Sequence, residues 1–323
     1  MVPACEAQPM TRPDPRIAVL IPCYNEEATV ATVVRDFRAS LPAAVIIVYD
    51  NNSRDATAAR AREAGALVRL ETRQGKGNVV RRMFADIEAD IYVLVDGDDT
   101  YDAAVAPALI GKLIDEGLDI VSGQREATGA SAYRRGHVLG NRLLTGLTSL
   151  MFGVRVGDML TGYRIMSRRF VKSFPSAAAG FGIETELTVH AVRMKVPMAE
   201  VKTPYRERPA GSASKLNTYR DGIRILLTIV GLMRRERPLI FFGSIFAFFA
   251  LLSLAIGVPV VIEYFQTGLV PRLPTAVLVT GMMMLAFLSL FTGLILDTVT
   301  RGRWEIKRLR YLAIPGPQDL KKP

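Results

Sequence analysis

Two long uncharged stretches near the C-terminal end constrain this chain more than any other feature. Residues 239–262 and residues 273–296 contain no charged side chain. About 20 predominantly apolar residues are enough for a helix to cross a bilayer. A helix of that length inside a soluble protein is rarely free of charge along its whole surface. We therefore predict two transmembrane helices.

The charges that flank these stretches predict their orientation. The segment between them offers only Arg272 and Glu263. The outer flanks are basic, with Arg234, Arg235 and Arg237 before the first stretch and Arg301, Arg303, Lys307, Arg308 and Arg310 after the second. Because cations concentrate on the cytoplasmic side, we expect an inner or plasma membrane protein whose termini and globular part are cytoplasmic. Small residues in the stretches, Gly243, Ser244 and Gly281, would allow close helix packing and a homo-oligomer.

Composition favours a membrane partner over nucleic acid. The chain carries a formal charge of +10 and is 50% hydrophobic, a combination suited to an anionic bilayer surface. No run of lysine and arginine is interleaved with aromatic residues, so we expect no nucleic acid partner. The two cysteines, Cys5 and Cys23, provide no disulfide framework. The two histidines, His137 and His190, are not spaced relative to the cysteines as the ligands of a zinc site would be.

The first part of the chain alternates between strand and helix patterns. Short β-branched runs predict strands at residues 17–21, 44–49, 67–70, 91–95 and 118–122. Between them, helices are expected at residues 26–41, with Asn25 as the N-cap, and at 76–89 and 103–116. A further helix is expected after the loop at residues 50–55 and ends at about residue 64. This alternation predicts an α/β fold, a doubly wound and mostly parallel sheet.

Acidic and polar loops follow several of the predicted strands. The run after residues 92–95 contains Asp96, Asp98 and Asp99. Closely packed carboxylates favour a Mg²⁺ or Mn²⁺ ion that also binds phosphate oxygens, although a solvated acidic turn explains a single Asp-x-Asp equally well. Glu26 and Asp50, in loops expected at the same sheet edge, are suited to accept hydrogen bonds from a nucleoside. Both of their loops are also compatible with simple capped turns.

Four of these loops together resemble a known family. They read Ile-Pro-Cys-Tyr-Asn-Glu-Glu from residue 21, Asp-Asn-Asn-Ser-Arg-Asp-Ala-Thr from residue 50, Gly-Lys-Gly from residue 75 and Asp-Gly-Asp-Asp-Thr-Tyr-Asp from residue 96. In this order they resemble the family 2 inverting glycosyltransferases of the GT-A fold, and within them the dolichyl- and polyprenyl-phosphate sugar synthases. The resemblance covers about residues 16–237. It implies a nucleotide-sugar donor, a Mg²⁺ or Mn²⁺ cofactor and a polyprenyl phosphate acceptor in the lipid bilayer.

The resemblance also implies roles for individual residues. Those matching the donor side are Pro22, Tyr24, Glu26, Asp50, Asn52, Gly75, Lys76 and Asp96. The implied metal ligands are Asp96, Asp98 and Asp99, and because Thr100 replaces a glutamine common in relatives, water is the alternative to Asp99. The implied catalytic residues are Asp158, as a catalytic or positioning acid, and Arg125, Arg208 and Lys215, which face phosphates. Arg125, Arg134 or Arg135 would orient the acceptor phosphate. Arg208 and Lys215 belong to a segment that resembles a mobile phosphate lid and otherwise reads as a juxtamembrane basic patch.

These patterns combine into a domain plan. We expect a disordered tail at residues 1–15, the GT-A catalytic domain at 16–213, the lid end and a juxtamembrane amphipathic helix at 214–237, two spans at 238–298 and a basic cytosolic tail at 299–323. Amphipathic patterns at residues 137–152 and 216–233 fit either core helices or helices at the bilayer interface.

The expected function is inverting transfer of one hexose, preferably from a UDP-sugar, to polyprenyl phosphate at the cytoplasmic face. The product would serve glycan or cell-envelope modification. The enzymatic alternatives are a GDP-mannose-dependent dolichyl-phosphate mannose synthase and a glycosyltransferase with a hydroxyl acceptor on a glycolipid or polysaccharide. A membrane partner that kept the fold without the chemistry, and a small channel, are the alternatives of other classes.

Overall fold

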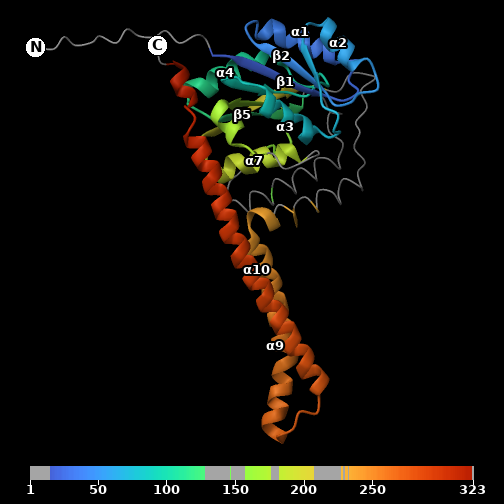
Figure 1. Ribbon diagram of the computed structural model, residues 1–323, viewed down its shortest axis with the longest axis vertical. Coiled ribbons are helices and arrows are strands. Elements are labelled where there is room, and N and C mark those ends of the chain that lie inside the picture. Colours follow the sequence, from blue (N-terminus) through green and yellow to red (C-terminus); the bar gives the residue numbers. More distant parts are fainter. Residues whose placement is uncertain are drawn as a thin grey trace, which may run out of the picture. The chain divides into compact units, whose positions relative to one another are not determined.

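The chain forms two compact units. The computed structural model describes residues 15–127, 146, 157–175, 182–206, 227, 230–231 and 233–321. The first unit comprises Met1–Asp221 with Lys307–Pro323, and the second comprises Gly222–Ile306 (Figure 1). The helices expected at residues 137–152 and 216–233, and the tail expected at residues 1–15, lie outside the described residues apart from isolated positions.

The first unit contains a seven-stranded sheet in the order β3-β2-β1-β4-β6-β5-β7. Its strands are β1 (Ile17–Cys23), β2 (Val45–Asp50), β3 (Leu67–Leu70), β4 (Ile91–Leu94), β5 (Ile120–Ala127), β6 (Arg164–Ser167) and β7 (Met198–Tyr205). The pairs among β1 to β4 are parallel, as is β5 with β7, whereas β6 is antiparallel to both β4 and β5. The predicted mostly parallel α/β sheet is therefore confirmed.

Helices cover both faces of this sheet (Figure 1). They are α1 (Val30–Ser40), α2 (Thr57–Glu63), α3 (Lys76–Asp86), α4 (Ala106–Asp115), α6 (Arg168–Ser173) and α7 (Ile183–Met194), with the short 3-10 turns η1 (Ala103–Val105) and η2 (Pro317–Lys321). Side chains alternate along β1, so Val19 and Ile21 join a core with Phe37 of α1 and Leu109 of α4. On the other face, α3 packs on β1 and also contacts α6 and α7.

The expected N-cap at Asn25 is wrong. Helix α1 begins at Val30 with Thr29 in the cap position, and Asn25 adopts a left-handed backbone with φ of 53°. The Asn25 backbone N–H donates to Ser53 Oγ at 2.9 Å, and its side-chain oxygen accepts from the Arg54 N–H at 2.8 Å. The asparagine joins two loops at the sheet edge instead of starting the helix, because its short side chain tolerates this backbone conformation.

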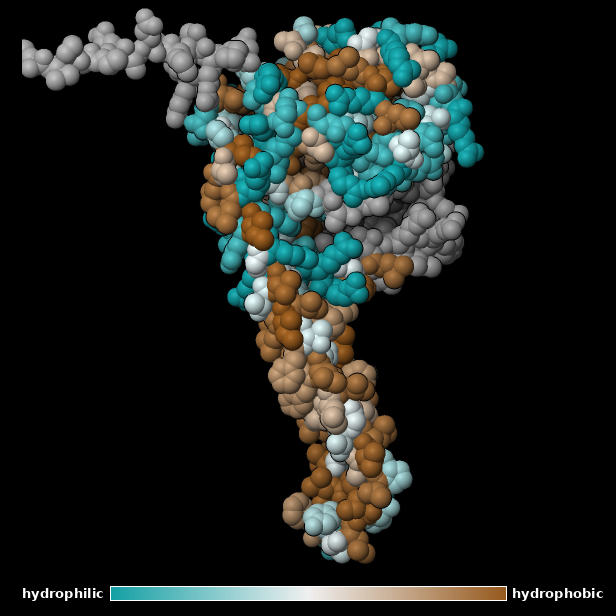
Figure 2. Space-filling view, in the orientation of Figure 1, coloured by the Kyte–Doolittle hydropathy of each residue, from teal (hydrophilic) through white to brown (hydrophobic). Residues whose placement is uncertain are grey.

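The second unit is dominated by two long apolar helices. Most of α9 (Pro238–Thr267) and α10 (Leu273–Leu312) lies in this unit, and both are long and apolar enough to cross a membrane. Only 11% of the most apolar window of each is buried, unlike the core helix of a soluble protein. Figure 2 shows hydrophobic residues spread over the surface of both helices.

Hydrogen bonds join the two helices side by side. Ser253 Oγ donates to the Val279 carbonyl and Ser289 Oγ to the Phe242 carbonyl, each at 3.0 Å. Since the later residue of one helix pairs with the earlier residue of the other, α9 and α10 are antiparallel. Helix α10 runs on to Leu312, past residue 298 where we expected the second span to end.

The end of α10 contacts a buried carboxylate of the first unit. Asp119, which is 0% exposed and precedes β5, accepts a hydrogen bond from the Tyr311 hydroxyl at 2.6 Å. The Arg169 guanidinium donates to both oxygens of Asp119, at 2.5 and 2.8 Å, and lies 4.6 Å from the Tyr311 ring centroid. Because β5 starts here, this cluster lies at the sheet edge opposite to the carboxyl ends of the parallel strands.

Replacing Tyr311 by phenylalanine should destabilise the protein. The substitution removes one hydrogen bond to a buried charged group, a loss on the order of 1 kcal/mol or more. We expect a lower midpoint of thermal unfolding for Tyr311→Phe in detergent. Tyr264→Phe is the matched control, because Tyr264 is exposed on α9. Equal midpoints for the two variants would contradict the assigned contribution of Tyr311.

Candidate active site

Three loops leave the sheet at the same edge. In the parallel register Cys23 lies beside Asp50, and Leu20 lies beside Leu94. The pairing continues past the strands, because the Asn51 N–H donates to the Cys23 carbonyl at 2.8 Å and the Val95 N–H donates to the Leu20 carbonyl at 3.1 Å. The loops after β1, β2 and β4 therefore start next to one another.

Four carboxylates lie close enough to Cys23, at the end of β1, to act on its thiol. The pKa of the Cys23 thiol is raised well above its ordinary value, first by complete burial and then by nearby negative charge. The residues that contribute this charge are Glu26, Asp50, Asp96 and Asp98. The structure thus brings together acids that are widely separated in the sequence.

Asp50 and its neighbour Asn51 organise the donor-side loops. Asp50 is buried, and its Oδ1 has no hydrogen-bond partner among the described residues. Asn51, which sequence reasoning missed, donates through its side chain to the carbonyls of Glu71 and Arg73 and accepts from the Gly75 N–H at 2.7 Å. Asn51 thus fixes the loops after β2 and β3. Asp50 Oδ1 is left able to accept a hydrogen bond from a bound molecule.

The other residues implied for the donor side differ in burial and in backbone conformation. Pro22 is buried in β1 beside Tyr49, and Tyr24 is half-buried. The Glu26 N–H donates to Thr57 Oγ1 at 2.8 Å. Asn52 is exposed with a left-handed backbone, φ 61°.

Lys76 binds two carboxylates. It is the first residue of α3, after Gly75 with φ of 125°. Its Nζ lies 2.5 Å from Asp96 Oδ1 and 2.6 Å from Glu184 Oε1. Burial alone would lower the pKa of Lys76, but the two carboxylates raise it well above its ordinary value. The lysine is therefore charged and held against the first acid of the Asp-x-Asp pair.

Thr100 orients the second acid of that pair. Asp98 is 3% exposed, and its Oδ1 accepts from Thr100 Oγ1 at 2.6 Å and from the Thr100 N–H at 3.3 Å. Asp99 has a left-handed backbone with φ of 58°. Its pKa is raised by burial and by the charges of Asp36 and Asp98, with Arg206 acting against them. Thr100 thus supports Asp98 through both its side chain and its backbone.

The carboxylates of Asp96 and Asp98 are suited to bind a divalent cation whose remaining coordination positions are filled by a bound substrate. Carboxylate oxygens are preferred by Mg²⁺ and Mn²⁺, which often use one or two carboxylates together with substrate phosphates. Within the described residues, no three acidic, histidine or cysteine side chains are grouped as a metal site. Asp96 and Asp98 fit such a cation, and Asp99 as the third ligand stays a prediction.

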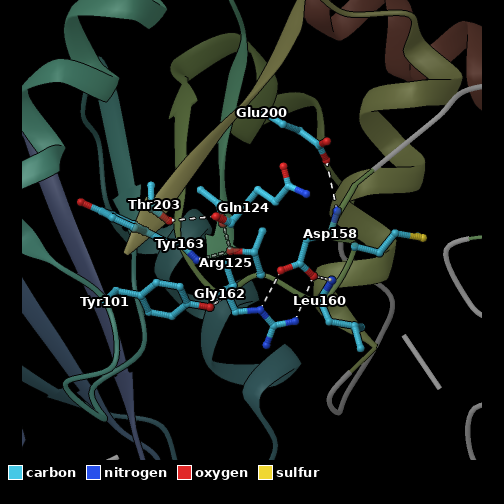
Figure 3. Close-up of polar contacts among 12 residues, drawn as sticks. Tyr101, Gln124, Arg125, Asp158, Leu160, Gly162, Tyr163, Glu200 and Thr203 are labelled. Atoms are coloured by element: carbon cyan, nitrogen blue, oxygen red, sulfur yellow. Dashed lines mark hydrogen bonds and ion pairs between the residues drawn. The ribbon is translucent and has the colours of Figure 1, made fainter. Parts of the chain in front are cut away.

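Gly162 places backbone directly against Asp96. A Cβ at Gly162 would collide with the Asp96 carboxylate. The Gly162 N–H donates to the Tyr101 hydroxyl at 2.8 Å, and Tyr101 is buried (Figure 3). The sequence analysis gave a role to neither residue, although Tyr101 lies in the acidic motif that starts at residue 96. They connect the acidic loop with the segment that contains Asp158.

Arg125 and Asp158 form a two-point ion pair (Figure 3). Arg125 Nε donates to Asp158 Oδ2 at 2.7 Å, and Nη2 donates to Oδ1 at 2.9 Å. The Leu160 N–H also donates to Asp158, at 3.1 Å. Burial raises the pKa of Asp158, but the hydrogen bonds and charge of Arg125 outweigh it, and the net pKa lies below its ordinary value. Asp158 is therefore ionised at neutral pH.

Four implied phosphate-binding residues fall in parts of the chain outside the described residues. They are Arg134, Arg135, Arg208 and Lys215. Their roles stay predictions. The contact of Glu184 with Lys76 was not predicted, because the two residues lie far apart along the chain.

Comparison with known proteins identifies the class. Residues 18–174 match the model described as Glycosyl transferase family 2. The chain is 35% identical to glycosyltransferase AglJ of Haloferax volcanii over 257 residues, covering 79% of this chain and 83% of AglJ. It is 32% identical to a dolichyl-phosphate hexose transferase of the same organism over 221 residues, covering 68% of this chain and 95% of that protein.

A solved structure shares the fold. Glucosyl-3-phosphoglycerate synthase from Mycobacterium tuberculosis, in complex with Mn²⁺ and uridine-diphosphate-glucose, superposes with a TM-score of 0.54. The two are 26% identical, and the match covers 68% of this chain and 78% of that one. The sheet and its acidic edge thus define a sugar-transferring enzyme of the GT-A fold. The chain belongs to glycosyltransferase family 2.

Substituting Gly162 by alanine should impair donor binding without unfolding the protein. The new methyl group would displace the Asp96 carboxylate from its place beside Lys76. We expect the affinity for UDP with Mn²⁺, measured by titration calorimetry, to fall by about tenfold or more. Gly111→Ala in α4 is the control, because a Cβ there meets only Asp115 Oδ2, at 4.0 Å. Unchanged affinity in Gly162→Ala would contradict the close approach to Asp96.

Proposed function

We propose that the enzyme transfers one hexose, preferably from a UDP-sugar, to polyprenyl phosphate at the cytoplasmic membrane face, with inversion at the anomeric carbon. The proposal rests mainly on the presence of two features in one chain. Acidic side chains gather at one edge of the GT-A sheet, and two exposed apolar helices are long enough to cross a membrane. The similarity to a protein named dolichyl-phosphate hexose transferase supports the same acceptor class.

The donor side follows from charge and hydrogen-bonding capacity. Glu26 and the Asp50 oxygen that has no hydrogen-bond partner among the described residues would accept hydrogen bonds from the nucleoside. Asp96 and Asp98 would hold a divalent cation, Mg²⁺ or Mn²⁺, which when bound stabilises negative charge on the diphosphate leaving group. The relative crystallised with Mn²⁺ and uridine-diphosphate-glucose supports this arrangement.

The acceptor side needs orientation more than proton transfer. A phosphate monoester has a second pKa of about 6, so its oxygen is already a nucleophile at neutral pH. Its oxygen would form the new bond to the anomeric carbon as the bond to the diphosphate breaks. Arg125, fixed by Asp158 at two points, would direct the acceptor phosphate. Since the pKa of Asp158 is lowered, Asp158 acts as a positioning residue and not as a proton acceptor.

The remaining predicted cations complete this plan. Arg134 and Arg135 would also contact the acceptor phosphate, and Arg208 and Lys215 would bind phosphates from the lid segment. Charge on the leaving diphosphate favours such donors at the moment of bond breakage.

The membrane helices account for the acceptor. A polyprenyl chain stays in the hydrocarbon layer, so its phosphate reaches only an enzyme held at that surface. The basic flanks of α9 and α10 favour a cytoplasmic location for the first unit and for both termini, where nucleotide-sugars are made.

The test is a transfer assay with the purified full chain. The protein is incubated with Mn²⁺ or Mg²⁺, polyprenyl phosphate and a panel of UDP- and GDP-linked sugars, and lipid-linked sugar is detected by mass spectrometry. We expect a lipid phosphate carrying one hexose with inverted anomeric configuration. Asp98→Asn should lower the rate by about a hundredfold or more, because it removes a charge from the diphosphate-binding edge.

Three outcomes would overturn this function. They are transfer only to hydroxyl acceptors, donor hydrolysis without transfer, and full activity in Asp98→Asn. Glu116→Gln, which changes an exposed carboxylate at the C-cap of α4, is the control that should leave the rate unchanged. Preference for a GDP-sugar would replace the UDP assignment and leave the acceptor assignment intact.

A further inference from the structure

Glu184 is a buried carboxylate outside the residues assigned to donor, metal or acceptor. It lies in the first turn of α7 with a side chain that is 7% exposed. Its Oε1 contacts Lys76 Nζ at 2.6 Å, while its Oε2 is buried with no hydrogen-bond partner among the described residues. A buried carboxylate oxygen without a hydrogen-bond donor is costly, so this oxygen is available to a further donor.

Lys76 is shared between Glu184 and a proposed metal ligand. Its ammonium lies between Glu184 and Asp96, with nearly equal distances of 2.6 and 2.5 Å. The three groups carry a net charge of −1. If Asp96 were the only carboxylate beside Lys76, the lysine would neutralise it and weaken its attraction for a cation.

We propose that Glu184 is a positioning residue that holds Lys76 and thereby keeps the Asp96 carboxylate attractive to the divalent cation of the donor complex. This inference rests on the proposed function, which places that cation at Asp96 and Asp98. The geometry supports it from three elements, because α3 supplies the lysine, the loop after β4 supplies Asp96 and α7 supplies Glu184. Gly162 lies against the Asp96 carboxylate, where a Cβ would collide with it.

The net charge of the three groups predicts the order of Mn²⁺ affinities among the variants. Lys76→Met makes it −2, Glu184→Gln makes it 0, and the double variant returns it to −1. We expect Mn²⁺ affinity to rise about tenfold in Lys76→Met and to fall about tenfold in Glu184→Gln. The double variant should bind Mn²⁺ about as well as the unsubstituted protein.

The measurement is Mn²⁺ binding to the full chain in detergent, without nucleotide, followed through the electron paramagnetic resonance signal of the free ion. Glu184→Asp retains the charge and should restore most of the affinity lost in Glu184→Gln. Glu116→Gln is the matched control, because Glu116 pairs with Lys112 at the same 2.6 Å but on the exposed surface of α4. It should leave Mn²⁺ affinity unchanged.

The outcomes separate this inference from the proposed function. If the unsubstituted protein binds no Mn²⁺ even with UDP, the proposed donor site fails. If it binds Mn²⁺ but both single variants weaken binding and the double variant is weakest, the role of Glu184 is structural and the inference is overturned. Should Glu184→Gln not fold, stronger binding by Lys76→Met than by the unsubstituted protein supports the inference, and weaker or equal binding overturns it.

Discussion

The interaction on which the site depends most is the contact of one lysine ammonium with two carboxylates. Lys76 joins the start of α3 to Asp96 after β4 and to Glu184 on α7. These elements come from distant parts of the sequence, so a single buried cation fixes their relative positions within the first unit. The order then extends through Gly162, which lies against Asp96 and donates to Tyr101.

A second, partly buried ion pair lies between Arg125 and Asp158. Arg125 and Asp158 neutralise each other through two hydrogen bonds, and each keeps its charge in a partly buried place. The site is thus built from preformed ion pairs whose charges are oriented before any ligand binds. Such preorganisation is the main way in which an enzyme stabilises charge that develops on a leaving group.

Sequence reasoning captured the parts that depend on local pattern. Buried runs such as β1 and β4 and the acids that follow them were predictable, because strand periodicity and turn chemistry are local. The parts that failed or were missed depend on distant contacts. The local sequence predicts Asn25 as a cap, whereas its actual partners Ser53 and Arg54 belong to another loop. The short antiparallel strand β6 has no apolar run of its own. The contact of Glu184 with Lys76 has no local signal.

The proposed site requires that a divalent cation binds at Asp96 and Asp98 while Glu184 retains Lys76. An experimental structure of the full chain with UDP and Mn²⁺ would show whether both contacts form together. We expect Mn²⁺ bonded to oxygens of Asp98, Asp96 and the diphosphate, with Lys76 Nζ still within hydrogen-bond distance of Glu184. Mn²⁺ bound away from these acids, or a Lys76 side chain that has left Glu184, would contradict the proposed site.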